Sequence, residues 1–300
     1  MVRLFVILFV FFLSGCGSLQ QENTMKEYDV TISVTEAVVP SESGITERPE
    51  LLSPLVQPEN EDFVRVKDYI PEIYTELKYA GEDNFTGQKI YGFDDIFLRY
   101  GTVMKLKAVS DEVNQQGYYL KLWDGFRPVS AQYKLWEICP DPEYVANPNK
   151  GYSNHSRGFA VDLTLVDRQG REVVMPTGFD DFSSQADRDY SDCLPEAADN
   201  ARFLEAVMER NGFKGYRGEW WHFNDNQTYD VETCFDPAII CRMRVTEDCV
   251  LLKSIWDSAD NVLTIPAQTD VTLLGYLEEY AMVEYWGYRG YIPSSIITTE

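Results

Sequence analysis

The sequence predicts an α+β domain with a small antiparallel sheet, followed by a small all-β barrel. From residue 63, helix and strand patterns alternate without a repeated βαβ rhythm, which is typical of an α+β fold. From about residue 241, short strands are separated by Asp, Asn, Gly and Pro, which is typical of a small barrel. A length of 300 residues is sufficient for roughly two domains.

The composition limits the classes of function. With 44% hydrophobic residues the chain can form a core, which excludes a wholly disordered protein. Its 49 acidic and 26 basic residues give a formal net charge of −23, which argues against nucleic-acid binding because phosphate recognition needs a basic face. Only two histidines are present, so any imidazole chemistry must use His155, His222 or both.

Residues 1–16 are expected to be a targeting segment. Arg3 precedes ten uncharged residues, Leu4–Leu13, which are too few to span a membrane and are typical of a signal-peptide core. The sequence Leu13-Ser14-Gly15-Cys16 resembles a bacterial lipobox, whose cysteine is lipidated and becomes the mature N-terminus. An ordinary signal peptide is the alternative. The lipobox predicts an extracytoplasmic lipoprotein, anchored in the membrane through Cys16.

Residues 17–62 are expected to be an acidic, flexible linker. They contain ten acidic residues, two basic residues, four prolines and a single aromatic residue, Tyr28. Such a segment buries too little apolar surface to offset the entropy lost on ordering.

Residues 63–238 are expected to form the first folded domain. Helical spacing of apolar residues predicts three helices, and alternation of apolar with polar residues predicts two strands. Gly117 and Gly212 are expected to end the first and the third helix. Ser130 is the expected N-cap of the second helix. The helices are Thr102–Gln116, Ser130–Ile138 and Ala197–Asn211, and the strands are Tyr118–Trp123 and Phe159–Leu165. The second strand is expected to be half-buried, with Asp162 on its polar face.

Two short segments contain the candidate chemistry. His155 lies in a Ser/Asn/Gly-rich loop before Asp162, and Glu219 lies three residues before His222 among aromatic residues. Two histidines and one carboxylate leave an open position on a tetrahedral zinc ion, and a second carboxylate can serve as the general base. The structural alternative pairs Asp162 with Arg157 and leaves the aromatic residues as core.

The spacing of Glu219 and His222 restricts the local backbone. Residues three apart on a regular strand point to opposite faces. If the segment is a strand, as its aromatic residues and the nearby Gly215 and Gly218 indicate, a bulge or a strand end must bring the two side chains together.

The motifs together resemble the D-alanyl-D-alanine dipeptidase family of zinc peptidases, the VanX-like enzymes of vancomycin resistance. The central matches are Ser153-x-His155-x-x-Gly158-x-Ala160-x-Asp162 and Glu219-x-x-His222. Further matches, in the family's order, are Lys78-Tyr79-Ala80, Asn84-Phe85-Thr86-Gly87, Trp123-Asp124-Gly125-Phe126-Arg127-Pro128 and Phe179-Asp180. The resemblance spans about residues 63–236, and its motifs are specific in combination.

The resemblance implies a role for each matching residue. His155, Asp162 and His222 would hold one Zn²⁺ per chain, with Glu219 as the catalytic base. Arg127 would stabilise the oxyanion of the tetrahedral intermediate. The residues implied to hold or orient the substrate are Ser153, Tyr79, Asp180 and Asp124. Of these, Asp180 is the anionic partner for a free amine, and Asp124 either orients Arg127 or caps the turn.

Residues 241–300 form the expected all-β unit, with five strands predicted from the turn signals. These are Val250–Leu252, Val262–Ile265, Val271–Tyr276, Met282–Trp286 and Tyr291–Ile292. The ending from Glu284 to Ser295 resembles bacterial SH3-like domains, which implies contact with peptidoglycan through Tyr and Trp. Alternatively, these aromatic residues fill the barrel or pack on the first domain.

The implied function is zinc-dependent hydrolysis of the small substrate D-alanyl-D-alanine in cell-wall peptide metabolism, in glycopeptide resistance or in scavenging D-alanine. One alternative is a D,D-carboxypeptidase acting on peptidoglycan stem peptides, and another is a non-catalytic wall-binding lipoprotein. Five cysteines follow Cys16, so at least one thiol must stay free or pair outside the chain. These are Cys139, Cys193, Cys234, Cys241 and Cys249.

Overall fold

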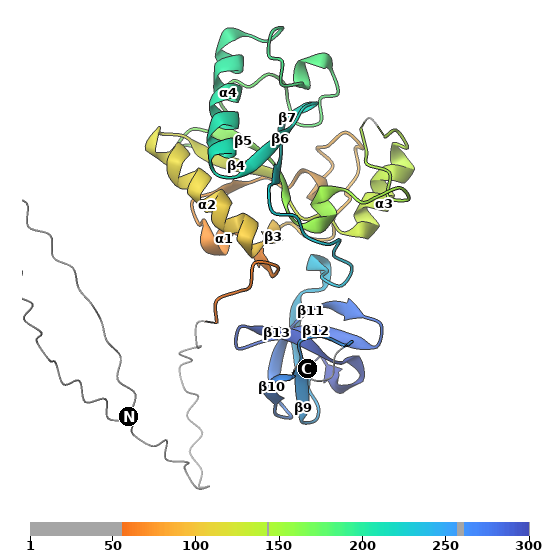
Figure 1. Cartoon of the computed structure of the whole chain (residues 1–300). Coiled ribbons are helices and arrows are strands. Elements are labelled where there is room, and N and C mark those ends of the chain that lie inside the picture. The colour runs from red at the N-terminus through yellow and green to blue at the C-terminus, as the bar shows by residue number, and fades with distance from the viewer. Residues whose placement is uncertain (1–55, 143, 257–260, 300) are drawn as a thin grey trace, which may run out of the picture. The chain divides into compact units, whose positions relative to one another are not determined.

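A computed structural model describes residues 56–142, 144–256 and 261–299 (Figure 1). The expected signal peptide with Cys16, and the expected linker apart from residues 56–62, lie outside these residues. Within the described part of the chain, no helix has both the length and the apolar character needed to cross a membrane.

The first domain is built on a five-stranded sheet. Its strands, in spatial order, are β2 (Tyr74–Thr75), β4 (Tyr119–Asp124), β5 (Ala160–Val166), β7 (Glu219–Asp225) and β6 (Phe213–Tyr216). All neighbours are antiparallel except β2 and β4, which pair in parallel. The prediction of a small antiparallel sheet is therefore confirmed, except that the short edge strand β2 pairs in parallel. A separate antiparallel pair joins β1 (Phe63–Arg65) to β3 (Phe97–Arg99).

Helices α2 (Tyr100–Gln115) and α4 (Pro195–Arg210) lie side by side against the sheet (Figure 1). Both agree with the predicted helices to within two residues at each end. The third predicted helix is α3 (Val129–Ile138), and its N-cap is Pro128, so the prediction that Ser130 caps it is wrong. The shorter helices are α1 (Val66–Tyr69), η1 (Lys78–Ala80), η2 (Asn154–Arg157) and η3 (Ser184–Ala186).

Strand β5 is buried on both faces, which corrects the expectation of a half-buried strand. Val161, Leu163 and Leu165 belong to the same apolar core as residues of α2 and α4. Asp162 and Thr164 alternate with them and so point to the opposite face, where they are also buried. The polar face of β5 is therefore an interior surface, and its charge must be balanced by neighbouring groups.

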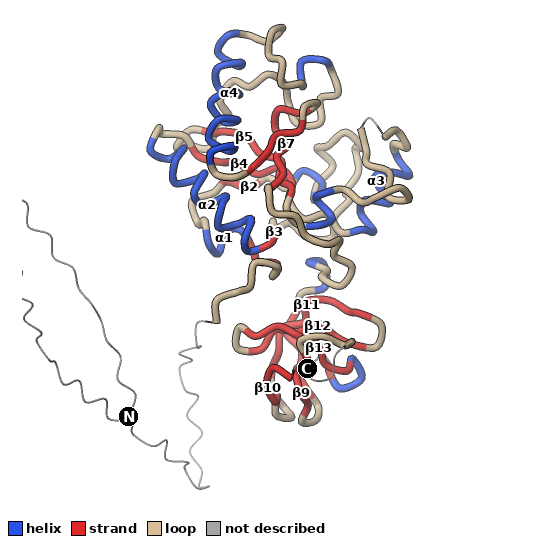
Figure 2. The backbone as a smooth tube through the Cα atoms, in the orientation of Figure 1, coloured by secondary structure: helices blue, strands red, loops and turns tan. Residues whose placement is uncertain are grey.

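The C-terminal region is all-β, as predicted, and forms one antiparallel seven-stranded sheet (Figure 2). The strands in spatial order are β10 (Asn261–Ile265), β9 (Cys249–Leu252), β13 (Tyr288–Pro293), β12 (Tyr280–Tyr285), β11 (Asp270–Leu277), β8 (Cys241–Val245) and β14 (Ile297–Thr298). Among the strands described, β10 and β14 are the two edges of the sheet and do not pair with each other. The predicted barrel is therefore not confirmed, because the sheet is not closed. Sequence patterns missed β8 and β14. The 3-10 turns η4 (Pro237–Ile239) and η5 (Ser294–Ile296) complete this region.

The five cysteines beyond Cys16 are all free thiols. Cys234 is buried, Cys241 is exposed, and the other three are half-buried. No disulfide therefore supports the described part of the fold.

Gly158 ends η2 and directs the chain into β5. Its φ of +78° lies in the left-handed region, where a side chain is strained. An added Cβ would also lie 2.6 Å from Cζ of Phe63 and 3.2 Å from Cγ of Arg99. The backbone that connects His155 to Asp162 therefore requires glycine at this position.

We expect Gly158→Ala to lower the free energy of unfolding by about 2–4 kcal/mol, because left-handed strain and overpacking add. Gly87→Ala is the matched control, since Gly87 has a φ of +62° but nothing within 4 Å of an added Cβ. Its cost should be about 1 kcal/mol. Denaturant titration measures both, and equal losses in the two variants would contradict the steric argument.

Candidate active site

The centre of the site is a row of side chains that crosses three neighbouring strands. Asp162 on β5 is paired with Asp124 on β4 and with His222 on β7. Directly paired residues on one sheet face have adjacent side chains, so the register alone brings Asp162 and His222 together. His155 comes from η2, the turn that precedes β5.

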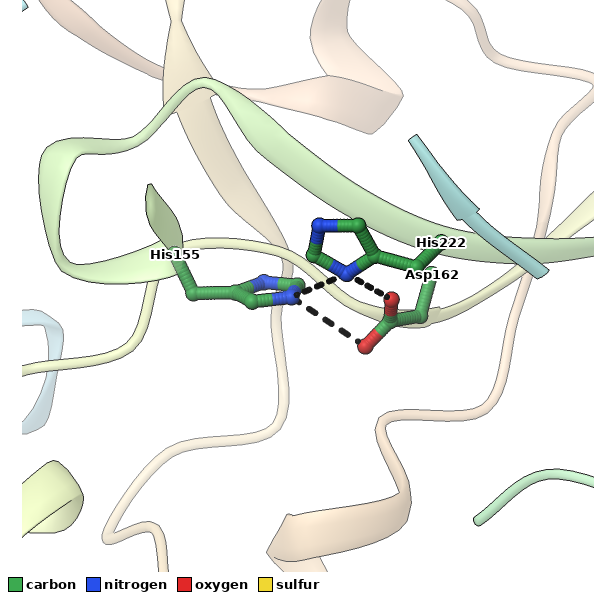
Figure 3. Close-up of side chains that lie close together, drawn as sticks. All are labelled: His155, Asp162 and His222. Atoms are coloured by element: carbon green, nitrogen blue, oxygen red, sulfur yellow. Dashed lines mark hydrogen bonds and ion pairs between the residues drawn. The ribbon is translucent and has the colours of Figure 1, made fainter. Parts of the chain in front are cut away.

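Three potential metal ligands converge at this row (Figure 3). His222 Nδ1 lies 2.9 Å from Asp162 Oδ1, and His155 Nε2 lies 3.3 Å from Asp162 Oδ2. The two imidazole nitrogens are 3.2 Å apart. Among the residues that the structure describes, this is the one group of three or more His, Cys, Asp or Glu side chains close enough to hold a metal ion.

The other nitrogen of each imidazole is held by a hydrogen bond. His155 Nδ1 donates to the carbonyl oxygen of Gly125 at 2.8 Å, because a carbonyl can only accept. His222 Nε2 donates to Asn224 Oδ1 at 3.2 Å, and Asn154 Nδ2 donates to the same oxygen at 2.9 Å. Both bonds leave a lone pair on the nitrogen that faces Asp162. Such partners fix the tautomer and orientation of metal-binding histidines.

The donor set fits zinc. Ligand atoms about 2.0–2.1 Å from a tetrahedral zinc ion are about 3.4 Å apart, close to the separations of the three atoms here. Two lone-pair nitrogens and a carboxylate meeting without a proton between them repel one another unless a cation is present. Three protein ligands leave the fourth tetrahedral position open, as in catalytic zinc sites.

Burial alters the acidity of the two carboxyl groups beside the histidines. Burial raises the pKa of Asp162, but protonated imidazoles at His155 and His222 outweigh it and hold the pKa below its usual value. A bound cation would shift the pKa in the same direction. Burial, and then repulsion from Asp162, raise the pKa of Glu219 despite attraction to His222. Asp162 therefore has the character of an anionic ligand, whereas Glu219 has the higher affinity for a proton that a general base needs.

Glu219 lies beside the potential ligands without belonging to their set. Its Oε2 is 3.7 Å from Nδ1 of His222. The two residues share a face because the pairing of β6 with β7 is irregular: Gly215 pairs with Phe223, and the next residue, Tyr216, pairs with Glu219. The predicted bulge is therefore confirmed.

Arg127 is buried and fixed by three side chains. Nη2 and Nε donate to Asp124 Oδ2 at 2.7 and 3.2 Å, Nη1 donates to Gln132 Oε1 at 3.0 Å, and Nε also contacts the hydroxyl of Tyr91. A guanidinium has five N–H groups, so one on each terminal nitrogen remains available. Asp124 also accepts from the backbone N–H of Gly125, so it both orients Arg127 and caps the turn.

Buried Tyr79 pairs with the half-buried Asp180. The Tyr79 hydroxyl donates to Asp180 Oδ2 at 2.9 Å, and Arg127 Cζ lies 5.2 Å from the Tyr79 ring centroid. Burial, and then repulsion from Asp162, hold the pKa of Asp180 well above its usual value. Asp180 also has a φ of +54°, which is uncommon for a residue other than glycine and recurs at functional sites.

Ser153 has a local structural role. It is the N-cap of η2, where its hydroxyl oxygen accepts from the backbone N–H of His155 at 3.2 Å. The structure thus brings the other proposed site residues together, and Ser153 holds the turn that carries His155.

Sequence patterns missed four residues that support the site: Tyr91, Gln132, Asn224 and Arg188. Strand alternation could have identified Asn224, because a residue two positions after His222 lies on the same face. Tyr91 lies in an irregular segment without a periodic signal. Arg188 donates to the carbonyl oxygens of Trp220 and His222, and Gln132 accepts from Arg127. Neither contact produces a periodic pattern in the sequence.

Comparison with known proteins identifies the family. A family model described as Peptidase_M15, D-ala-D-ala dipeptidase, matches residues 59–239, more than half of the chain. The chain belongs to this family. The D-alanyl-D-alanine dipeptidase of Escherichia coli (strain K12) is 40% identical over 153 residues, which cover 51% of this chain and 79% of the relative.

A second member of the dipeptidase family, from Enterococcus faecalis, is 32% identical over 197 residues, covering 59% of this chain and 98% of the relative. It too is named D-alanyl-D-alanine dipeptidase. A solved structure of the vancomycin-resistance D,D-pentapeptidase VanY is 16% identical and covers 44% of this chain and 74% of that chain. Its TM-score of 0.31 is too low to add to the assignment.

The hydrogen bond from His222 to Asn224 predicts an effect on metal affinity. We expect Asn224→Leu to weaken Zn²⁺ binding about 10–100-fold, because the imidazole loses the acceptor that fixes its tautomer. Competition with a chromophoric chelator measures the affinity. Asn226→Leu is the matched control, since Asn226 is exposed and contacts Lys105 instead of a histidine. Equal affinities in the two variants would contradict the role of Asn224.

Proposed function

We propose that the protein is a zinc-dependent dipeptidase that hydrolyses D-alanyl-D-alanine, with one zinc ion per chain held by His155, Asp162 and His222. Membership of the dipeptidase family and the convergence of three ligand atoms support this proposal. One observation carries it: the carboxyl group of Asp180 is held at 2.9 Å by the Tyr79 hydroxyl, and the centroid of the Tyr79 ring lies 5.2 Å from Cζ of Arg127.

The chemistry follows from the positions of these residues. Bound zinc would polarise a water molecule and lower its pKa to about 7. Glu219 accepts the proton of the attacking water on its carboxylate and then donates it to the departing amine. Arg127 donates its two remaining N–H groups to the oxygen that becomes negative as the carbonyl carbon turns tetrahedral. Because Asp124 and Gln132 already hold the guanidinium, little reorganisation accompanies this step.

Substrate selection depends on how the site binds the free amine of the dipeptide. Asp180 would pair with the free ammonium group, whose positive charge favours the ionised carboxylate, and Tyr79 and Ser153 would contribute hydrogen bonds. A dipeptidase must bind this amine next to the scissile bond, whereas a D,D-carboxypeptidase must leave that side open for the rest of a stem peptide. The half-buried carboxyl group of Asp180 at this place favours the dipeptidase. Retention of three ligands, a base and Arg127 opposes a non-catalytic wall-binding role.

The proposal also concerns the location of the enzyme. The signal peptide and lipobox support an extracytoplasmic enzyme held in the membrane by lipid on Cys16. The C-terminal sheet would be an SH3-like module that contacts peptidoglycan. Its partly exposed Tyr276, Trp286 and Tyr288 are suited to stacking on sugars or peptides. An enzyme in the envelope would act on released D-alanyl-D-alanine, either to scavenge D-alanine or in glycopeptide resistance.

A substrate panel tests the proposal. We expect the zinc-loaded chain to hydrolyse D-Ala-D-Ala but not L-Ala-L-Ala, N-acetyl-D-Ala-D-Ala or a stem pentapeptide, because only the first offers a free amine and the D configuration. A chelator should abolish turnover, and added Zn²⁺ should restore it. D-Alanine release, measured by an amino-acid assay, distinguishes the alternatives. Release from the pentapeptide alone would establish the carboxypeptidase, and no release from any substrate would favour the wall-binding role.

The role of Glu219 separates turnover from metal binding. We expect Glu219→Gln to retain one zinc ion per chain and to lower kcat about 10²–10⁴-fold, because the amide cannot accept the proton. Metal analysis and steady-state kinetics measure the two properties. Glu209→Gln, at an exposed position on α4, is the control and should have the wild-type kcat. Zinc lost from Glu219→Gln would show that Glu219 is a ligand instead of the base.

A further inference from the structure

The bulge in β7 leaves part of this strand without its usual partner. Because Gly215 pairs with Phe223 and Tyr216 pairs with Glu219, the three residues from Trp220 to His222 have no paired residue on β6. Two of them, Trp220 and Trp221, separate Glu219 from His222. An irregular ladder must satisfy its backbone carbonyls by other donors, since unpaired buried carbonyls are costly.

Arg188 supplies these donors from a segment distant in sequence. Its Nη2 donates to the carbonyl oxygens of Trp220 at 3.0 Å and of His222 at 2.9 Å. Its Nε donates to the carbonyl oxygen of Tyr216 at 2.8 Å. One guanidinium therefore connects both strands across the bulge. The Arg188 backbone N–H also donates to the carbonyl oxygen of Arg217 at 3.1 Å, which holds the segment against the turn between β6 and β7.

The surroundings hold Arg188 in this position. Its Cζ lies 4.3 Å from the ring centroid of Phe223, and its Nη1 lies 3.3 Å from Glu205 Oε1. Only 8% of its side chain is exposed. Gly215 provides the space: an added Cβ would lie 2.5 Å from Nε and 2.7 Å from Nη2 of Arg188. The Arg188 guanidinium thus occupies the space that a side chain at position 215 would fill.

We propose that Arg188 is a positioning residue, which replaces the missing ladder bonds of the β7 bulge and so holds Glu219 and His222 on the same face of the strand. The inference rests on the proposed function, in which Glu219 is the base and His222 a zinc ligand. The physical reason is the spacing: in a regular strand, residues three apart would point to opposite faces. A base displaced by about 1 Å can lose about 10²-fold in rate.

Four variants test this role: Arg188→Met, Arg188→Lys, Gly215→Ala and the double variant Arg188→Met/Gly215→Ala. Gly215→Ala retains every hydrogen-bonding side chain and disturbs only the position of the guanidinium. Arg171→Met is the matched control, because Arg171 is 77% exposed and pairs with Asp167 in a turn away from the site. For each variant we would measure the melting temperature, zinc content, kcat and KM for D-Ala-D-Ala, and the visible spectrum of the Co²⁺-loaded protein.

We expect folded, zinc-loaded Arg188→Met to lose about 10²-fold in kcat with little change in KM, and its Co²⁺ spectrum to differ from that of the wild type. Gly215→Ala should change both properties in the same direction, and Arg188→Lys should be intermediate because one ammonium cannot replace the planar fork. The double variant should be no worse than Arg188→Met, since Gly215 acts only through Arg188. If Arg188→Met fails to fold, Gly215→Ala and Arg188→Lys decide the question.

An unchanged kcat and Co²⁺ spectrum in the folded variants would overturn the proposal, as would losses that simply add in the double variant. The Co²⁺ spectrum separates this result from failure of the proposed function. If the wild type does not cleave D-Ala-D-Ala, the dipeptidase assignment fails, and the spectra of the four variants still decide whether Arg188 positions His222.

Discussion

The buried carboxylate of Asp162 imposes the main physical requirement on this domain. It lies on the central strand β5, in register with a second buried acid, Asp124, and with His222. Two acids inside a sheet need cationic partners, because an unpaired buried charge is strongly destabilising. Arg127 pairs with Asp124. Asp162 faces the two imidazoles, so its partner would be the proton or the metal ion that these three side chains can share. The same arrangement places the side chains proposed to bind zinc next to the guanidinium proposed to bind the oxyanion.

The rest of the site depends on departures from regular secondary structure. Gly158 turns the chain between one ligand and the next, and the bulge in β7 brings Glu219 beside His222. Each irregularity exposes backbone groups that a regular element would pair, and each is stabilised by side chains from elsewhere in the chain. Placement of the proposed catalytic groups would therefore depend also on residues such as Arg188, whose hydrogen bonds go to the backbone.

Much of the fold could be predicted because it depends on local periodicity. The apolar spacing of α2 and α4 gave their bounds to within two residues at each end, and two histidines beside carboxylates limited the site to a few positions. Strand β5 was misjudged because alternating Asp162 and Thr164 suggested a solvent-facing side, whereas that side lines the interior. The hydrogen bonds of Tyr91, Gln132 and Arg188 join distant segments, so they depend on tertiary packing that periodicity does not encode.

The three potential ligands come from separate elements of the fold, so metal binding would affect how long the folded protein survives. His155 lies in a turn, and Asp162 and His222 lie on neighbouring strands, so a bound cation would cross-link parts of the chain up to 67 residues apart. A ligand that binds only the folded state raises the free energy of unfolding with the logarithm of its free concentration. Resistance to proteases would therefore rise with the concentration of free zinc where the chain resides.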